Sequence, residues 1–382
     1  MLGGGGARAA YQAGVLQYIA DVFPNAAFSI LTGVSAGAIN AAHLANNTGT
    51  FRQAAERLAA CWYEITADQV FTPESAMSLI RRIMVPSINK RHPAESVIHV
   101  DEGQALLDTA PLRAFLERNL QPVEGELRGV AENLRTGRLK AACITATNYA
   151  TGQTVTWVQG RDIGRWQRPN RVGIRTNLTV DHIMASTALP LLFPAVRVGN
   201  AWFGDGGIRL TSPLSPAIHL GATSICVIST RYGRSRREAD EPAVIGYPPA
   251  AQVMGLLMNA IFLDMLDQDA LNMKRINELV EHLAPHRRDG LRLIKLLMLR
   301  PSVDLGKLAS QYEIKVRGAL RLLTRGLGTG EIKSPDWLSM LLFEDDYIDR
   351  IVQIGWEDAR RQHDRLTEFF DDTVSTMTNG VQ

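Results

Sequence analysis

A five-residue stretch, Gly33-Val34-Ser35-Ala36-Gly37, constrains the fold of this 382-residue chain more than any other feature. It lies between a short β-competent segment, residues 28–32, and an alanine-rich helical segment, residues 38–45. A G-x-S-x-G sequence between a strand and a helix is typical of a nucleophile elbow, a sharp turn that lifts a serine off the sheet. The outer glycines let the chain turn tightly without Cβ clashes, and the helix N-terminus directs N–H groups at an oxyanion formed there. Ser35 is therefore a candidate nucleophile, with a plain tight turn as the alternative.

Composition narrows the classes of function. The chain is 46% apolar and 21% charged, and its net charge of +2 gives no reason to expect a nucleic-acid partner. Basic clusters at 231–237 and 286–288 fit solvated loops, with contact to anionic lipid headgroups as the alternative. The three cysteines are far apart, which argues against a disulfide framework or a metal site and favours a reducing compartment. We therefore expect a cytoplasmic protein, since no apolar run spans a membrane and no signal peptide is visible. Peripheral membrane contact is left open.

The order of the expected elements gives the fold class. Strands and helices alternate along the first 230 residues, which predicts an α/β fold with a mainly parallel sheet covered on both faces. We expect a catalytic domain at 1–230 and a mostly helical extension packed on it at 231–382. Strands are expected at 28–32, 140–147, 154–158, 195–198, 201–203, 224–229 and 294–299. Helices are expected at 50–63, 75–85, 102–119, 126–136, 179–188, 214–220, 304–327 and 336–370, with a loop at 86–100.

A second glycine-rich segment, residues 3–8, opens a helix near the start of the chain. Such a loop normally follows a strand, and only Leu2 precedes it. The first strand therefore looks truncated, and we expect the true start of the protein to lie upstream of Met1. The loop fits a loose G-x-G-x-x-A dinucleotide pattern, but that interpretation lacks the strand and leaves the elbow unexplained. The alternative is an oxyanion hole, in which consecutive backbone N–H groups converge on a developing negative charge.

The partner of the serine is sought among acids and histidines. None of the eight histidines stands in a setting that marks it as catalytic, although His219 or His282 could in principle complete a triad. Asp205, which ends an expected strand and precedes Gly206 and Gly207, is the better candidate. A carboxylate shielded from water has a raised pKa and can accept the serine proton directly. The alternative for Asp205 is an Asp-Gly turn without a catalytic role.

Three motifs in this order resemble the signatures of patatin-like phospholipases. They are Gly4-Gly5-Gly6-Ala7-Arg8 with the adjoining residues 11–16, Gly33-Val34-Ser35-Ala36-Gly37, and Asp205-Gly206-Gly207. The similarity covers roughly residues 2–230 and implies a three-layer α/β/α sandwich with a Ser–Asp dyad. By resemblance, Ser35 is the nucleophile and Asp205 the base. Gly4, Gly5 and Gly6 form the oxyanion hole and Arg8 helps to fix the loop. The chain departs from the family at Ala9, where the family's loop ends in glycine, and in the short first strand.

These observations predict a serine acyl hydrolase that cleaves fatty-acyl esters of lipids or phospholipids through an acyl-enzyme, without metal or cofactor. A close alternative is a lipid acyltransferase that uses the same dyad. The alternative from another class is a weakly active protein that binds membranes or partners through its helical C-terminal third.

Overall fold

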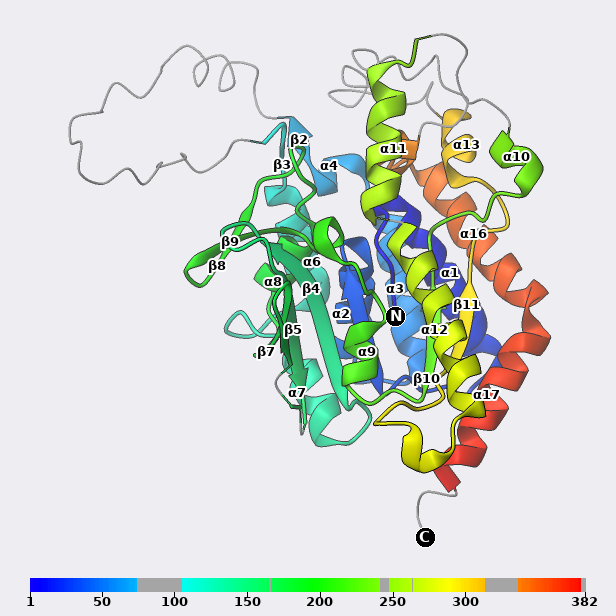
Figure 1. Ribbon diagram of the computed structural model, residues 1–382. Helices are drawn as coiled ribbons and strands as arrows, with labels where there is room; N and C mark the ends of the chain where they lie inside the picture. Colours follow the sequence, from blue (N-terminus) through cyan, green and yellow to red (C-terminus); the bar gives the residue numbers. More distant parts are fainter. Residues whose placement is uncertain are drawn as a thin grey trace.

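The protein is an α/β structure built around a central sheet (Figure 1). The computed structural model describes residues 1–73, 105–161, 163–164, 166–240, 247–262, 264–312 and 336–378. The expected helix at 75–85 and loop at 86–100 lie outside these residues, as does most of the expected helix at 304–327. In the part of the chain that is described, no helix combines the length and the apolar character that crossing a bilayer requires.

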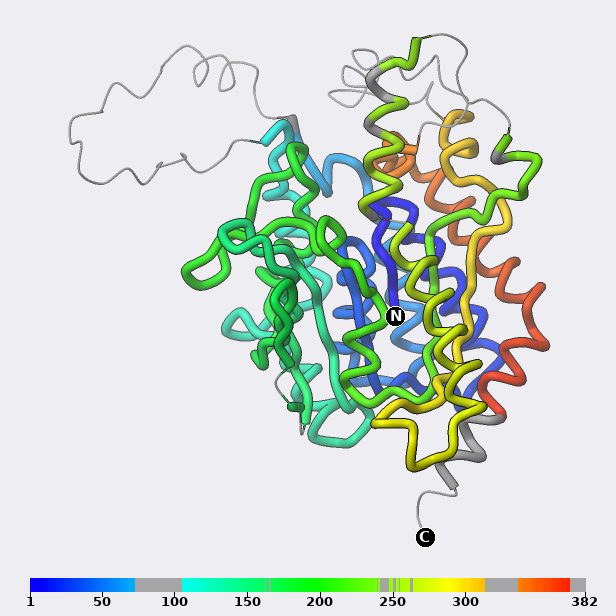
Figure 2. The backbone as a smooth tube through the Cα atoms, in the orientation of Figure 1, coloured from blue at the N-terminus to red at the C-terminus, as the bar shows by residue number. Residues whose placement is uncertain are grey.

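The central sheet is mixed. Its strands are β1 (Ile30–Val34), β4 (Ala141–Asn148), β5 (Thr154–Gly160), β6 (Gln167–Arg168), β7 (Arg171–Arg175), β8 (Val196–Val198), β9 (Ala201–Asp205), β10 (Ser224–Ile228) and β11 (Lys295–Leu299). A separate small pair joins β2 (Thr72–Pro73) and β3 (Leu107–Asp108). Leu2 forms parallel bridges to Gly33 of β1 and Ile228 of β10, so it connects the two halves of the central sheet. Figure 2 shows the resulting position of the N-terminus in the middle of the molecule.

The expectation of a mainly parallel sheet is wrong. Among the described strands, the pairs β1–β4, β5–β7 and β10–β11 are parallel. The antiparallel pairs of the central sheet are more numerous: β4–β5, β4–β9, β6–β7 and β8–β9. In β4–β5, β6–β7 and β8–β9 a short turn joins the two strands, and strands joined in this way can pair only antiparallel.

Helices cover the sheet on both faces (Figure 1). Those of the first two thirds are η1 (Gly6–Ala9), α1 (Ala10–Val22), α2 (Ala36–Asn46), α3 (Phe51–Glu64), α4 (Ala67–Val70), α6 (Ala110–Leu120), α7 (Arg128–Arg135), α8 (Val180–Thr187), η2 (Gly206–Arg209), α9 (Ser215–His219) and α10 (Arg236–Asp240). The last third contains α11 (Ala250–Phe262), α12 (Asp264–His282), η3 (Pro285–Arg287), α13 (Leu305–Ser310), α15 (Asp336–Leu341), α16 (Asp345–Arg361) and α17 (His363–Thr378). The helical character expected for 336–370 is confirmed by α15, α16 and α17.

Alternation along the strands produces two apolar layers. In β10, Cys226 and Ile228 face the large core that contains α1, α2 and α16. Their neighbours Ile225 and Val227 face a smaller cluster formed with α9 and α12. Successive side chains of a strand point to opposite faces, so this pattern requires helices on both sides of the sheet. Because the large core also contains buried residues of α15 and α16, the C-terminal helices and the elbow helix belong to one packed interior.

Helices α1 and α16 cross in close contact. A Cβ placed on Gly14 of α1 would overlap the carbonyl oxygen of Val352, and one on Gly355 of α16 would overlap that of Tyr11. Each glycine therefore admits the backbone of the opposite helix. This reciprocal contact holds the C-terminal extension directly against the helix that follows the glycine loop.

Gly355→Ala tests this contact. Alanine is favoured over glycine inside a helix by about 1 kcal/mol, but here its Cβ meets backbone that cannot move independently. We expect a net loss of about 1–3 kcal/mol in the free energy of unfolding, measured by urea denaturation. The control is Gly233→Ala, where the added Cβ has no neighbour within 4 Å. Equal stability of the two variants would contradict the close approach of α1 and α16.

Candidate active site

Strand β4 brings the ends of two other strands together. Along the edge of β4 that does not face β5, the pairing with β1 extends as far as Val34, which lies opposite Thr145. At the next position, Ala146, the partner is Asp205 at the end of β9. The chain of β1 leaves the sheet after Val34, and Asp205 occupies the register position that Ser35 would have taken. The structure therefore brings Ser35 and Asp205 together, although 170 residues of sequence separate them.

Ser35 stands at the sharp junction of β1 and α2. Its φ is 54° and its ψ is −135°, a conformation that non-glycine residues rarely adopt. The Ser35 amide donates to Ser186 Oγ at 2.9 Å, and the Ser186 hydroxyl donates to the Thr145 carbonyl at 2.6 Å. These bonds tie the turn to β4. Gly33 and Gly37 are also required, because a Cβ on Gly37 would overlap the carbonyl oxygens of Leu2 and Gly3.

The glycine loop lies directly beside the serine. A Cβ on Gly4 would lie 2.9 Å from Ser35 Cβ and 3.5 Å from Ser35 Oγ. Gly5 and Gly6 have φ values of 139° and 57°, which favour glycine. Within the described part of the chain, the amides of Gly4, Gly5 and Gly6 donate to no other protein group. Three consecutive amides are thus available beside the Ser35 side chain.

Several residues for which the sequence analysis gave no role hold this loop in place. Leu2 donates its amide to the Thr32 carbonyl at 2.8 Å, and Thr230 Oγ1 donates to the Gly4 carbonyl at 2.5 Å. The Gln12 amide group donates to the carbonyls of Gly3 and Ile228. Buried Asn40 and Trp62 extend the chain of hydrogen bonds, since Asn40 donates to Gln12 Oε1 and accepts from Trp62 Nε1. Asn40 in an alanine-rich helix was the one sequence signal that could have revealed this network.

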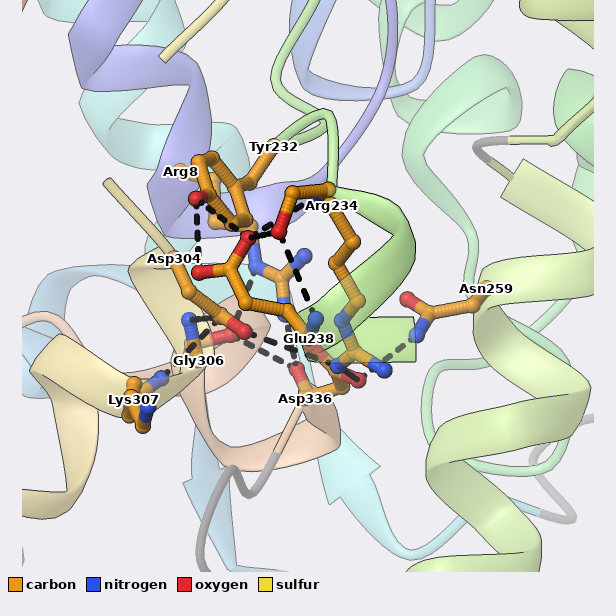
Figure 3. Close-up of polar contacts among 11 residues, drawn as sticks. Arg8, Tyr232, Arg234, Glu238, Asn259, Asp304, Gly306, Lys307 and Asp336 are labelled. Atoms are coloured by element: carbon orange, nitrogen blue, oxygen red, sulfur yellow. Dashed lines mark hydrogen bonds and ion pairs between the residues drawn. The ribbon is translucent and has the colours of Figure 1, made fainter. Parts of the chain in front are cut away.

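Arg8 connects the loop to the C-terminal helices (Figure 3). Its buried guanidinium donates to Ser339 Oγ at 2.6 Å and to both the carbonyl and the carboxylate of Asp336. Asp336 also accepts a hydrogen bond of 2.6 Å from Asn259 of α11, and Arg234 lies 4.0 Å away. Arg8, which was expected to help fix the loop, therefore donates to Asp336, a residue outside the sequence motifs.

Asp205 is fully buried. Its Oδ1 accepts the Gly207 amide at 2.8 Å, whereas Oδ2 is buried without a hydrogen-bond partner. Burial raises the pKa of Asp205 to about 7, and the Ser35 side chain and the Gly207 amide act in the opposite direction by favouring the charged form. The Ser35 hydroxyl is near enough to influence this pKa, although no hydrogen bond of regular geometry joins the two side chains. Gly206 is needed beside it because its Cβ would overlap the Thr145 carbonyl.

Ser35 contributes to the walls of two cavities. One is a narrow, almost wholly apolar space of about 50 Å³ that extends from Gly6 and Ser35 between α2, α3 and α6. The other, about 20 Å³, is bordered by Gly4, Gly207 and the residues at the junction of α11 and α12. Ser35 therefore borders a mainly apolar space on two sides.

None of the histidines in the described part of the chain completes a triad with these residues. No described histidine hydrogen-bonds to Ser35 or Asp205. Burial lowers the pKa of His182 to about 4, and His219 stacks on Trp166 instead. Among the described residues, no three histidine, cysteine, aspartate or glutamate side chains are close enough together to share a metal ion.

The raised pKa of Asp205 predicts a pH-dependent stability. Between about pH 4 and 7 the unfolded state loses this proton while the native state keeps it, so native stability falls as pH rises through that window. Asp205→Asn keeps an acceptor for Gly207 but cannot ionise. We expect the variant to exceed the wild type in unfolding free energy at pH 8 by on the order of 2–4 kcal/mol, with a much smaller difference at pH 4.5. Urea denaturation at both pH values, with the exposed Asp21→Asn as control, measures it. A difference that does not change with pH would contradict the raised pKa.

Comparison with known proteins identifies the family. The model described as "Patatin-like phospholipase" matches residues 1–218. Among solved structures, "Crystal structure of VipD from Legionella pneumophila" is similar at 13% identity and a TM-score of 0.36, over 96% of this chain. The chain spans 66% of the length of that protein chain. A comparison with curated proteins gives no significant match. Because the family model covers more than half of its residues, the chain belongs to the patatin-like phospholipase family.

Proposed function

We propose that this protein is a serine acyl hydrolase that cleaves fatty-acyl ester bonds of lipids, with Ser35 as nucleophile and Asp205 as general base. The observation that carries the proposal is the position of Ser35. Its backbone lies in a strained turn, and its side chain lies at the wall of an apolar cavity. On one side are glycine-loop amides that donate no hydrogen bond to the protein, and on the other is the buried carboxylate of Asp205. Family membership independently favours hydrolysis of lipid esters.

The groups present account for each proton in the reaction. Ser35 Oγ attacks the ester carbonyl carbon as its proton passes to Asp205, whose pKa near 7 suits a base at neutral pH. The amides of Gly4, Gly5 and Gly6 stabilise the negative charge on the carbonyl oxygen. The leaving alkoxide takes the proton from Asp205 and departs. Water then attacks the acyl-enzyme as one of its protons passes to Asp205. When the bond to Ser35 Oγ breaks, Asp205 returns that proton to Oγ, which releases the fatty acid and restores both side chains.

The apolar cavity supports an acyl-chain substrate. Its lining includes Ile39 of α2, Leu58 of α3 and Phe115 of α6, and its walls expose almost no polar surface. Along α2 it extends from Ser35 to His43, two turns of helix or about 12 Å. Burial of successive methylene groups there would contribute about 0.8 kcal/mol each.

Helix α11 supports peripheral contact with a lipid surface. Val253, Leu256 and Leu257 expose 46%, 60% and 52% of their surface. They lie one or two turns before Ile261, which borders the smaller cavity at Ser35. A lipid held at these side chains would be close to the entrance on that side of the nucleophile.

Ser35→Ala and Asp205→Asn test the dyad. Both should lower the rate of fatty-acyl ester hydrolysis to near background, because the first removes the nucleophile and the second the proton acceptor. A fluorophosphonate probe should label the wild type and not Ser35→Ala. In the wild type, kcat/KM should rise with pH through about 7, as Asp205 ionises.

Asp21→Asn is the matched control, since it makes the same chemical change in an exposed ion pair. Hydrolysis that persists in both dyad variants would rule out this mechanism. Labelling of Ser35 without ester turnover would instead favour a weakly active binding protein. Acyl transfer to an added alcohol at the expense of free fatty acid would favour the acyltransferase alternative.

Asp336→Asn tests the support of the glycine loop. The change leaves the buried Arg8 guanidinium without its counter-charge and loosens its hold on the loop. We expect kcat for ester hydrolysis to fall roughly tenfold with KM little changed, because the loop amides act on the transition state. Asp21→Asn again serves as control. A rise in KM alone would contradict a role of Asp336 in positioning these amides.

A further inference from the structure

A polar cavity lies apart from the two cavities that Ser35 borders. It has a volume of about 300 Å³ and is enclosed by β5, the β6–β7 hairpin and residues 209–216 that follow η2. Its lining contains hydroxyl side chains of Thr154 and Thr156 on β5 and of Ser212 and Ser215. Neither the proposed hydrolysis nor the three sequence motifs account for this cavity.

The charged side chains in the described lining are all positive. Arg168, Arg171 and Arg209 contribute to it, and none of the described aspartates and glutamates does. Within the described residues, none of the three arginines forms an ion pair, and Arg171 Nη1 is buried without a hydrogen-bond partner. Asp269, whose pKa burial raises and Arg171 lowers, is engaged by the Leu214 amide and lies outside the lining. A buried guanidinium nitrogen normally has an acceptor, so this nitrogen can donate to an oxygen atom of a ligand in the cavity.

The β6–β7 hairpin, which carries two of the arginines, is anchored by packing. Arg168 and Arg171 lie opposite each other in the β6–β7 register. Trp166, just before β6, lies against Gly173, where a Cβ would meet the indole ring, and stacks on His219 with ring centroids 5.2 Å apart. Burial lowers the pKa of His219, and the guanidinium groups of Arg171, Arg168 and Arg292 lower it further. Positive charge is therefore concentrated around this histidine.

We propose that this cavity binds a phosphate group. Guanidinium groups match the oxygens of phosphate with paired hydrogen bonds, and the hydroxyl groups of Ser212 and Ser215 can bond to the remaining oxygen. The hydroxyls of Thr154 and Thr156 are engaged by the Arg209 carbonyl and by Thr145. The pocket neighbours the proposed active site, because Leu210 lies in the wall of both this pocket and the smaller cavity beside Ser35. The phosphate can therefore belong to the headgroup of a phospholipid or to a free phosphate compound, and the experiment separates these sources.

Binding is measured on the full chain carrying Ser35→Ala, so that no lipid is hydrolysed and the outcome does not depend on the dyad. One arm follows the melting temperature with inorganic phosphate against chloride at equal ionic strength. The other follows co-sedimentation with phosphatidylcholine vesicles that contain or lack phosphatidic acid. Arg168→Gln/Arg171→Gln removes the proposed contacts. Arg175→Gln, on the same strand but outside the lining, is the matched control.

We expect one probe to bind, with an apparent affinity about tenfold or more weaker in the double variant and unchanged in Arg175→Gln. A response to phosphatidic acid alone identifies a headgroup site, and a response to inorganic phosphate identifies a site for a free phosphate compound. If the double variant does not fold, Arg209→Gln, which changes an exposed side chain, replaces it. Equal responses of the arginine variants and the control, or no response to either probe, would overturn the proposal.

Discussion

The register of β4 is the constraint on which the candidate site depends. One edge of this strand accepts β1 in parallel up to Thr145 and β9 in antiparallel from Ala146 onward. The change of partner forces β1 to leave the sheet after Val34, which creates the elbow at Ser35. The same change fills the vacated position with Asp205. A strand slip of one residue would move Asp205 to the opposite face, so the pairing of β4 with β9 and the chemistry at Ser35 are coupled.

The C-terminal helices stabilise the site from the other side. Asp336 and Ser339 hold the buried Arg8, and the contact of Gly14 with α16 holds the helix that follows the glycine loop. The conformation of the glycine loop is unfavourable by itself, because its backbone is strained and its amides donate no hydrogen bond to the protein. Contacts with the neighbouring helices therefore have to stabilise it. The residues beyond the family match supply this support, which explains why α15 and α16 share the large core with α1 and α2.

The candidate site contains a carboxylate whose burial is energetically unfavourable. Burying the Asp205 carboxylate without a partner on Oδ2 is unfavourable, yet it is the burial that raises the pKa of this group to about 7. Arg171 in the phosphate pocket shows a similar pattern, with a buried nitrogen that lacks an acceptor. Unsatisfied polar groups are rare in folded interiors, and both of these lie at places for which we propose a substrate or a ligand.

The sequence by itself determined the local features, because they depend on residues adjacent in the chain. The elbow, the flanking strand and helix, the glycine loop and the β4–β5 and β8–β9 turns follow from Gly, Ala and Ser at particular spacings, and the Ser35 turn is observed where it was expected. The sheet was predicted to be mainly parallel, since single-strand patterns do not reveal which edges pair. Only the tertiary structure determines that Asp205 takes the place on β4 next to the one that Val34 occupies. It also determines that Thr230, Gln12 and Asp336 hold the glycine loop. Such contacts join residues up to 328 positions apart, and only the packing of the whole chain determines them.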